Sequence, residues 1–305
     1  MDMEKISAEA LNSAFSELME TPEGQKEVQE AGLTYIKQYL REESFLRKVI
    51  NPVNITKFDT QRAVDSDTVE KVVDIEPGST ASAINFRSES PARWVEAPRY
   101  AIPFFTIASP MFEKTEQELF AYESPVIKII EENSVKDIQE VEDTKFIEFC
   151  TAAIALSGNL LQLPATTALT TKKTITDGFS LVDANRLQTD KVMMGSTTFN
   201  DVLALPSEQI GNPLSSEIVK DGYTYNQLIG KKFIVTSKTN LVPYGQMWFF
   251  AKQKYLGNFY ILNSTKFYIN KIADLIRFKT WEVIGVGIGN VNGVAKVEFG
   301  SGVVT

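Results

Sequence analysis

The feature that most constrains this chain is a long amphipathic stretch over residues 124–159. Apolar or small side chains recur there at intervals of three and four residues, which places them on one face of a helix. Ser124 and Pro125 are typical of a helix start, and Gly158 is typical of a helix end. About thirty residues at 1.5 Å each predict a rod of roughly 45 Å. We therefore expect a helix that joins separate parts of the molecule.

Residue type divides this predicted helix into a buried face and a solvated face. The side chains expected to be buried are Ile127, Ile130, Ser134, Val135, Ile138, Val141, Phe146, Phe149 and Ala153. The acidic side chains, expected to be solvated, are Glu131, Glu132, Asp137, Glu140, Glu142 and Asp143. The single cysteine, Cys150, cannot form an intrachain disulfide, and we expect it to be an inert core residue of this helix.

Length and composition predict a globular chain of one large domain or two. The chain has 305 residues, of which 43% are apolar, so a sizeable core is possible. No apolar run approaches the roughly 18 residues of a membrane helix, and the first residues lack the pattern of an export signal. We expect synthesis in the cytosol and no membrane partner.

The absence of histidine excludes several classes of function. It removes the usual general base, the imidazole of Ser/His and Cys/His nucleophile pairs, and the commonest transition-metal ligand. The net charge of -8 argues against a protein that wraps nucleic acid through clustered cations, although DNA can still be a neighbour. We expect no catalytic residue, no metal and no cofactor.

The glycines at 285, 287 and 289 do not form a nucleotide site by their pattern. A dinucleotide loop needs a glycine at the sixth place and a helix behind it, whereas Asn290 stands there and strand-like sequence follows. We interpret these residues as glycines of a β-sheet.

The N-terminal third is predicted to contain an arm, a helix and a long hairpin. Residues 1–30 carry eight acidic side chains against two lysines, which fits either a frayed terminus or an arm that orders on a partner. Apolar spacing predicts a helix over residues 33–50, ended by Asn51 and Pro52. Residues 70–76 and 81–87 alternate in polarity around a Pro-Gly turn, which predicts the two strands of a hairpin.

This hairpin has too few apolar residues to be stable alone in water, so we expect it to lie on a neighbouring subunit. The alternative is a hairpin that folds back on its own domain. The candidate contact residues are Lys71, Val73, Ile75, Ile84, Phe86, Arg87, Arg93 and Trp94.

The rest of the chain alternates between sheet-like and helical segments. Residues 93–107 suit an edge strand because they contain Pro98 and Pro103, and a short polar helix is expected over 115–122. Residues 160–185 show no clear period and are expected to be irregular. A compact α/β unit is predicted over 186–262, with strands at 191–194, 232–236, 246–251 and 259–262 and a helix at 198–205. The strands of the tail, 266–299, are expected to pair with the sheet entered near Tyr100.

The order of these elements resembles the major capsid protein of tailed bacteriophages, the Hong Kong 97 fold, which is an α+β fold. The resemblance covers nearly the whole chain, and its local motifs are diffuse. They are the helical run at 139–146, the strand, cap and helix at 192–205, and the turn at 240–243 before the strand at 246–250.

The resemblance implies a division of the chain into an N-terminal arm, a connecting helix, an extended hairpin called the E-loop, a peripheral domain built on the long helix, and an axial domain. The corresponding ranges are 1–32 for the arm, 33–52 for the helix, 53–97 for the E-loop, 98–159 with 266–305 for the peripheral domain, and 160–265 for the axial domain.

The resemblance also implies a function and partners. We expect a major capsid subunit that self-assembles into hexamers and pentamers of an icosahedral shell around double-stranded DNA. A separate scaffolding protein, a portal at one vertex and decoration proteins are implied, with assembly in the host cytoplasm and a final location in the virion capsid. Some members join subunits by a bond between a lysine and an asparagine, for which Lys71 and Asn290 are the candidates.

Two alternatives remain open from the sequence. Encapsulins, which are cellular compartments, share this fold. A histidine-independent cytosolic enzyme is also possible, with the α/β unit as its body and a cleft against the long helix as its site.

Overall fold

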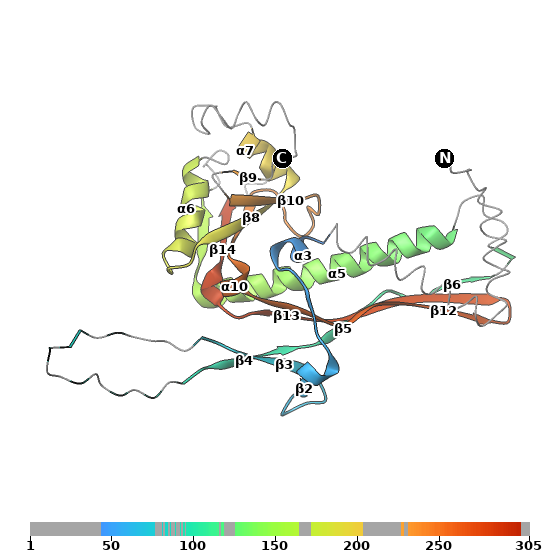
Figure 1. The fold of residues 1–305 in the computed structure, drawn as a ribbon. Coiled ribbons are helices and arrows are strands. Elements are labelled where there is room, and N and C mark those ends of the chain that lie inside the picture. Colours follow the sequence, from blue (N-terminus) through green and yellow to red (C-terminus); the bar gives the residue numbers. More distant parts are fainter. Residues whose placement is uncertain are drawn as a thin grey trace, which may run out of the picture.

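The structure is a computed structural model, and it describes residues 44–76, 96–115, 117–118, 126–164, 172–203, 227–228 and 231–299, with separate positions at 81, 83, 84, 86, 89, 92 and 94. Three sheets are arranged around one long helix (Figure 1). The predicted acidic arm, most of the helix predicted over 33–50 and most of that over 115–122 lie outside the described residues.

The predicted long helix is confirmed as α5, Val126–Ser157, with 32 residues. Ile138, Phe146 and Ala153 lie on its buried face as expected, and Cys150 is fully buried. Val141 is 42% exposed, so the prediction that it is buried was wrong. The buried face instead includes Glu142 and Asp143, whose partners are described below.

A five-stranded sheet lies along one side of α5 (Figure 1). Its centre is a long antiparallel ribbon of β12, Gly257–Ile272, and β13, Leu275–Ile288. β1, Val53–Asn54, pairs with β12, while β5, Phe105–Ala108, and β6, Phe112–Thr115, pair with β13. Residues 259–262 belong to this ribbon, so their assignment to the core of the α/β unit was wrong.

A six-stranded sheet forms the α/β unit. Its order is β7, Leu160–Leu163; β14, Val294–Phe299; β11, Gln246–Ala251; β8, Thr189–Gly195; β10, Lys231–Thr236; and β9, Gln227–Leu228. The strands predicted at 191–194, 232–236 and 246–251 are confirmed, as is a helix after β8, α7, Ser196–Leu203.

Two expectations about this sheet were wrong. Residues 160–185 are not irregular, because they contain β7 and helix α6, Lys172–Asp183, which buries Ile175, Phe179 and Val182. The last strand, β14, does not pair with the sheet near Tyr100, because it lies between β7 and β11. These pairings join segments far apart in sequence, and local polarity patterns carry no information about them.

A three-stranded sheet forms the root of the projecting hairpin. β2, Gln61–Arg62, and β4, Arg99–Pro103, both pair with β3, Val69–Asp74. The hairpin is thus confirmed, but its return strand is β4 and not residues 81–87, of which the described positions 81, 83, 84 and 86 are in no strand. From here on, "the hairpin" means β3, β4 and the chain between them.

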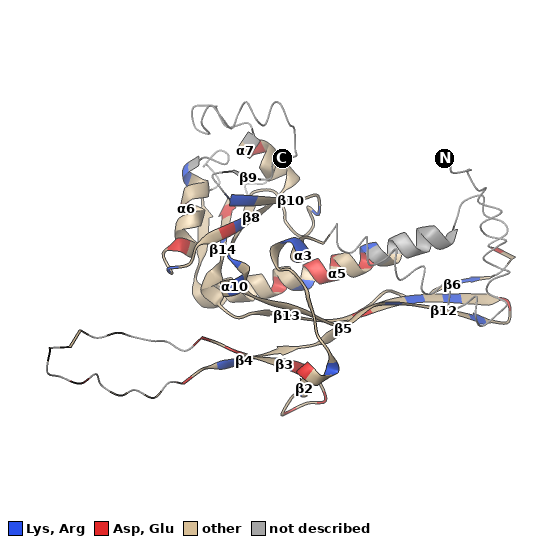
Figure 2. Ribbon diagram, in the orientation of Figure 1, with Lys and Arg blue, Asp and Glu red and all other residues tan. Residues whose placement is uncertain are grey.

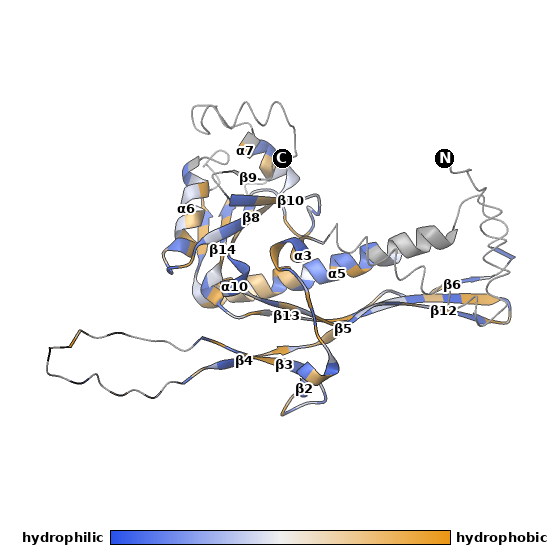
Figure 3. Ribbon diagram, in the orientation of Figure 1, coloured by the Kyte–Doolittle hydropathy of each residue, from blue (hydrophilic) through white to orange (hydrophobic). Residues whose placement is uncertain are grey.

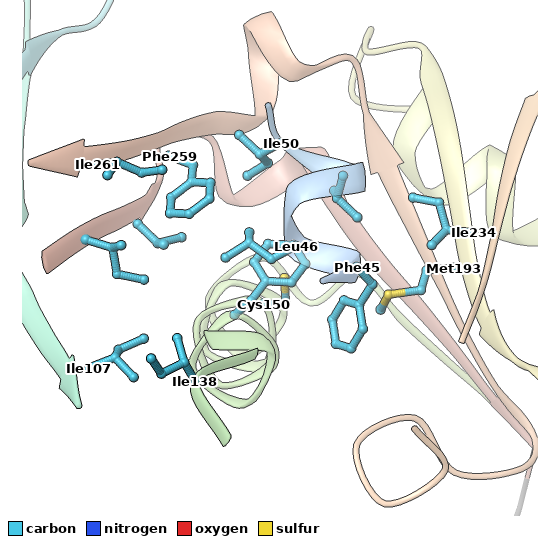
Figure 4. Close-up of a cluster of buried hydrophobic side chains, with 14 of the residues drawn as sticks. Phe45, Leu46, Ile50, Ile107, Ile138, Cys150, Met193, Ile234, Phe259 and Ile261 are labelled. Carbon is cyan, nitrogen blue, oxygen red and sulfur yellow. The ribbon is translucent and has the colours of Figure 1, made fainter. Parts of the chain in front are cut away.

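The apolar side chains form two buried clusters. The hydropathy colouring shows apolar segments on both the strands and the helices (Figure 3). The larger cluster joins α5, the ribbon and α3, Phe45–Val49 (Figure 4). Short elements complete the fold: α10, Gln253–Leu256, and the 3-10 turns η1, Lys57–Asp59, and η3, Val291–Gly293. Within the ranges given above, no helix combines the length and apolarity needed to span a membrane.

Candidate inter-subunit surface

The hairpin is attached to the body where β4 crosses β13. Three side chains at alternate positions, Tyr100, Ile102 and Phe104, face the three glycines of β13 and its end. A Cβ atom at Gly287 would lie 2.5 Å from Ile102 Cγ1, and one at Gly285 would lie 2.9 Å from a ring carbon of Phe104. The glycines therefore allow the two strands to cross closely, and their interpretation as sheet glycines is confirmed for Gly285 and Gly287, which lie within β13.

The crossing is also held by a polar contact. The side-chain amide of Asn258 donates a hydrogen bond of 3.0 Å to the hydroxyl of Tyr100. Burial raises the pKa of the Tyr100 hydroxyl above its usual value, so the group stays neutral and able to donate as well as accept. Beside it, an open cavity of about 260 Å³ separates the hairpin root from α10 and the start of β12.

Beyond the root, the hairpin exposes large apolar side chains. Phe86 and Trp94 are 106% and 98% exposed, and Ile84 is 50% exposed. Aromatic side chains of this size normally bury most of their area, because each buried Å² contributes about 25 cal/mol. In the isolated chain this part of the hairpin packs on nothing that the structure describes, which is typical of a surface that binds a partner.

The remaining candidate contact residues are distributed along the same hairpin. Lys71 and Val73 are half-buried in β3, and Ile75, just beyond it, is 36% exposed. Arg87 and Arg93 lie outside the described residues. Asn290, the other member of the candidate cross-link pair, caps η3 by accepting a hydrogen bond of 3.0 Å from the backbone of Asn292.

A buried ionic cluster lies on α5 and was not predicted from the sequence. The prediction that Glu142 and Asp143 are solvated was wrong, since they are 1% and 0% exposed. Arg47 of α3 pairs with Glu142 at 3.1 Å and with Glu282 of β13 at 3.0 Å. The hydroxyl of Thr265 donates to the other oxygen of Glu282 at 3.1 Å. One buried guanidinium thus joins three elements.

Asp143 forms the second half of this cluster. It accepts hydrogen bonds from the Ser44 hydroxyl at 2.9 Å and from the Leu46 backbone amide at 3.1 Å, and it pairs with Lys238 at 2.7 Å. Burial raises the pKa of Asp143, and the Lys238 charge opposes that rise. The carboxylate therefore holds the start of α3 against α5.

The position of these two acids gave a signal that the sequence analysis did not use. Glu142 lies four residues after Ile138 and four before Phe146, so all three share one face of the helix. An acid inside an apolar stripe requires a buried partner, but neither Arg47 nor Glu282 can be identified from spacing.

Within the described part of the chain, no group of acidic, cysteine or histidine side chains is arranged to hold a metal ion.

The sequence matches no protein-family model and no curated protein. The structure is similar to solved structures of viral and virus-like particles. A chain from Microbacterium phage Oxtober96 matches with a TM-score of 0.60 and 11% identity, covering 85% of this chain and 91% of that one. The capsid structure of the cyanophage P-SCSP1u matches with a TM-score of 0.55 and 9% identity, covering 81% of this chain and 86% of that one. The capsid of a native GTA particle matches with a TM-score of 0.54 and 13% identity, covering 83% of this chain and 89% of that one. The chain therefore has the α+β fold of these capsid proteins, the Hong Kong 97-like fold.

Proposed function

We propose that this protein is the major capsid subunit of a tailed phage or a related particle, and that it self-assembles into an icosahedral shell. The observation that carries the proposal is a capsid fold over more than four fifths of the chain, combined with a hairpin that exposes Phe86 and Trp94. A structural subunit of this kind has no catalytic residue and needs no cofactor, and its location is the virion capsid.

The observed elements support an assignment of the parts. The hairpin corresponds to the E-loop, α5 with the five-stranded sheet to the peripheral domain, and the six-stranded sheet to the axial domain. Because β14 lies in the six-stranded sheet, the axial domain takes residues 294–299. Because β12 begins at Gly257 and lies in the five-stranded sheet, the peripheral domain takes residues 257–265 and ends with β13. The arm at 1–32 lies outside the described residues. Of the connecting segment at 33–52 the structure describes residues 44–52, where the helix is α3, Phe45–Val49.

Contact between the hairpin and a neighbour is head-to-tail, because one copy offers the hairpin and the next offers a different surface. Such contacts close into rings when the rotation between copies closes. Rings of six and five copies then tile a shell. The net charge of -8 suits a container for DNA, since a cationic wall would hold the phosphates and hinder movement of the genome. A scaffolding protein, a portal and decoration proteins are the further partners of this proposal.

Electron microscopy of the purified protein tests the proposal. Closed shells, or rings of five and six copies, are the expected result. Uniform small particles with one concave pocket each would contradict it and favour the enzyme alternative. Free subunits should also bind DNA only weakly at moderate salt. Binding in the micromolar range or tighter would contradict the container argument.

The covalent cross-link between Lys71 and Asn290 is a separate part of the proposal. Lys71 lies in β3 of the hairpin root and Asn290 at the start of η3, and a bond between subunits would require Lys71 of one copy to reach Asn290 of another. A ladder of covalent oligomers on a denaturing gel of assembled shells is expected if the bond forms. Its absence would remove the cross-link and leave the shell proposal unchanged.

A further inference from the structure

Helix α3 is held by charged side chains from both large sheets. Lys191 of β8, in the six-stranded sheet, donates hydrogen bonds of 2.8 Å to the backbone oxygens of Lys48 and Val49 at the end of the helix. Glu282 of β13, in the five-stranded sheet, pairs with Arg47 at 3.0 Å. The five residues of α3 therefore bind two sheets that are built from different parts of the chain.

The apolar side of α3 covers one row of side chains on α5. Glu142, Phe146 and Cys150 follow one another at intervals of four residues, so they lie on one face of the helix. The rings of Phe45 and Phe146 lie 6.4 Å apart. Leu46 and Cys150 are fully buried and belong to the same apolar cluster, as Figure 4 shows. The docked α3 thus keeps water away from this row.

The charges beneath α3 are unequal in number. Glu142 and Glu282 are 1% and 2% exposed, and both pair with the one guanidinium of Arg47, whose side chain is 7% exposed. Asp143 is the other charged group that acts on Glu142, and its own charge is balanced by Lys238 at 2.7 Å. Figure 2 shows the basic segment of α3 beside acidic segments of α5. When both glutamates are ionised, the cluster carries one negative charge in excess.

One proton removes this excess charge. Two buried carboxylates that face one cation ionise in coupled steps, so the proton belongs to the pair and not to one residue. The raised pKa of Glu142, about 7, agrees with a proton held there in the neutral range. If α3 leaves α5, water reaches the carboxylates, and the pKa of Glu142 returns towards its ordinary value of about 4.5. The docked state therefore binds a proton that the released state gives up.

We propose that α3 is a proton-dependent latch on α5, held in place while Glu142 and Glu282 share one proton and loosened when that proton is lost. The loosened segment ends at β1, which pairs with β12 outside the ionic cluster. Because residues 1–43 precede α3 in the chain, its release also gives them a longer tether. The inference goes beyond the proposed function, since it concerns a change within one chain.

The direction of the response follows from proton linkage. Docking is favoured most below about pH 4.5 and least above about pH 7, because only the docked state keeps the proton between these values. Each rise of one pH unit in this window multiplies the ratio of released to docked chain by up to about tenfold. The latch therefore loosens as the pH rises from 5 to 8.

Hydrogen exchange of the purified chain at pH 5, 6, 7 and 8 tests the latch. The measured quantity is the protection factor of a peptide that contains residues 44–52, with the pH dependence of the chemical exchange rate divided out. It should fall by about tenfold or more from pH 5 to pH 8. A constant protection factor would overturn the inference.

Low concentrations of urea distinguish local release from global unfolding. Local release exposes little surface, so the protection of residues 44–52 should hardly change with urea, and it should stay below that of β11. If the two segments show equal protection at every urea concentration, α3 opens only with the whole chain, and the inference is wrong.

Glutamine variants test the shared proton. Glu142→Gln and Glu282→Gln each leave Arg47 with one carboxylate, so either change alone should remove most of the fall between pH 5 and pH 8. The two changes together leave Arg47 without a carboxylate and should lower the protection of residues 44–52 at both pH values. Glu140→Gln, at an exposed position of the same helix, is the control and should keep the fall of the unmodified chain. An unchanged fall in either single variant of the pair would contradict a shared proton and overturn the inference.

Discussion

Glu142 is a carboxyl group on the core side of α5, and its environment sets its charge. It shares Arg47 with Glu282, so two buried acids face one guanidinium. Burial raises the pKa of Glu142 to about 7, and the charge of Arg47 limits the rise. The group therefore changes its charge near neutral pH inside a packed core.

This pKa predicts a pH dependence of stability. A carboxyl group whose pKa is higher in the folded chain stabilises the fold most below its unfolded pKa, about 4.5, and that stabilisation is lost as the pH rises through about 7. The full shift corresponds to at most about 3 kcal/mol. Replacing Glu142→Gln removes the titration, so the free energy of unfolding of this variant relative to the unmodified protein should increase between pH 5 and pH 8. Denaturant unfolding at both values measures it.

The matched control is Glu140→Gln. Glu140 is exposed on the same helix and accepts a hydrogen bond from Asn240, which a glutamine oxygen can also accept. This variant measures the effect of removing an acidic side chain from the surface of the same helix, away from Arg47 and Glu282. An equal difference at pH 5 and pH 8 for Glu142→Gln would contradict the assignment.

At the scale of elements, α3 is held on α5 by charge as well as by apolar packing. Phe45 packs against Phe146 with ring centres 6.4 Å apart, and Arg47 lies between Glu142 and Glu282. A buried ion pair adds little net stability compared with apolar residues, but removing one partner leaves the other charges unpaired. The cluster therefore makes α3 sensitive to a single change.

We predict that Arg47→Ala lowers the free energy of unfolding by about 3 to 5 kcal/mol. Urea unfolding at pH 8, where Glu142 is charged, measures the loss. Lys48→Ala is the control, since that side chain is exposed on the same helix, and it should change stability by less than about 0.5 kcal/mol. A similar small effect of Arg47→Ala would show that the cluster does not hold α3.

The crossing of β4 over β13 depends on the absence of a Cβ atom at Gly287. Gly287→Ala should destabilise the chain by about 1 to 3 kcal/mol, because the new Cβ overlaps Ile102. In a chain that already carries Ile102→Ala, the further change Gly287→Ala should cost less stability than it does in the unmodified protein. Gly293→Ala, whose Cβ would have its nearest neighbour at 3.4 Å, is the control in thermal unfolding. Additive losses in the double variant would contradict the overlap.

At the scale of the whole molecule, the hairpin and the folded body are separable. Asp74 and Arg99 pair at the end of the root and are joined by an ion pair of 2.7 Å, so a tight turn can replace the chain between them. We predict that replacing residues 75–98 by Asn-Gly leaves thermal stability nearly unchanged and abolishes shell formation. Light scattering and circular dichroism measure the two effects. Shells formed by this variant would show that assembly does not depend on the hairpin.

The sequence by itself determined the features that depend on neighbours along the chain. The bounds of α5 differ by two residues at each end from those predicted, because its apolar spacing and end signals are local. The strands β8, β10 and β11 were likewise predicted from short apolar runs. The burial of Cys150 was predicted from its place on the helix. The order of these elements was sufficient to indicate the capsid fold.

Only the tertiary structure decided which distant segments meet. β3 pairs with β4 and not with residues 81–87, and β14 joins β7 and β11. Glu142 is buried because Arg47 and Glu282 lie beside it, although they are 95 residues before it and 140 after it in the chain. The physical reason is that strand pairing and buried charge depend on partners brought together by folding, whereas helix periodicity depends only on the chain's own geometry.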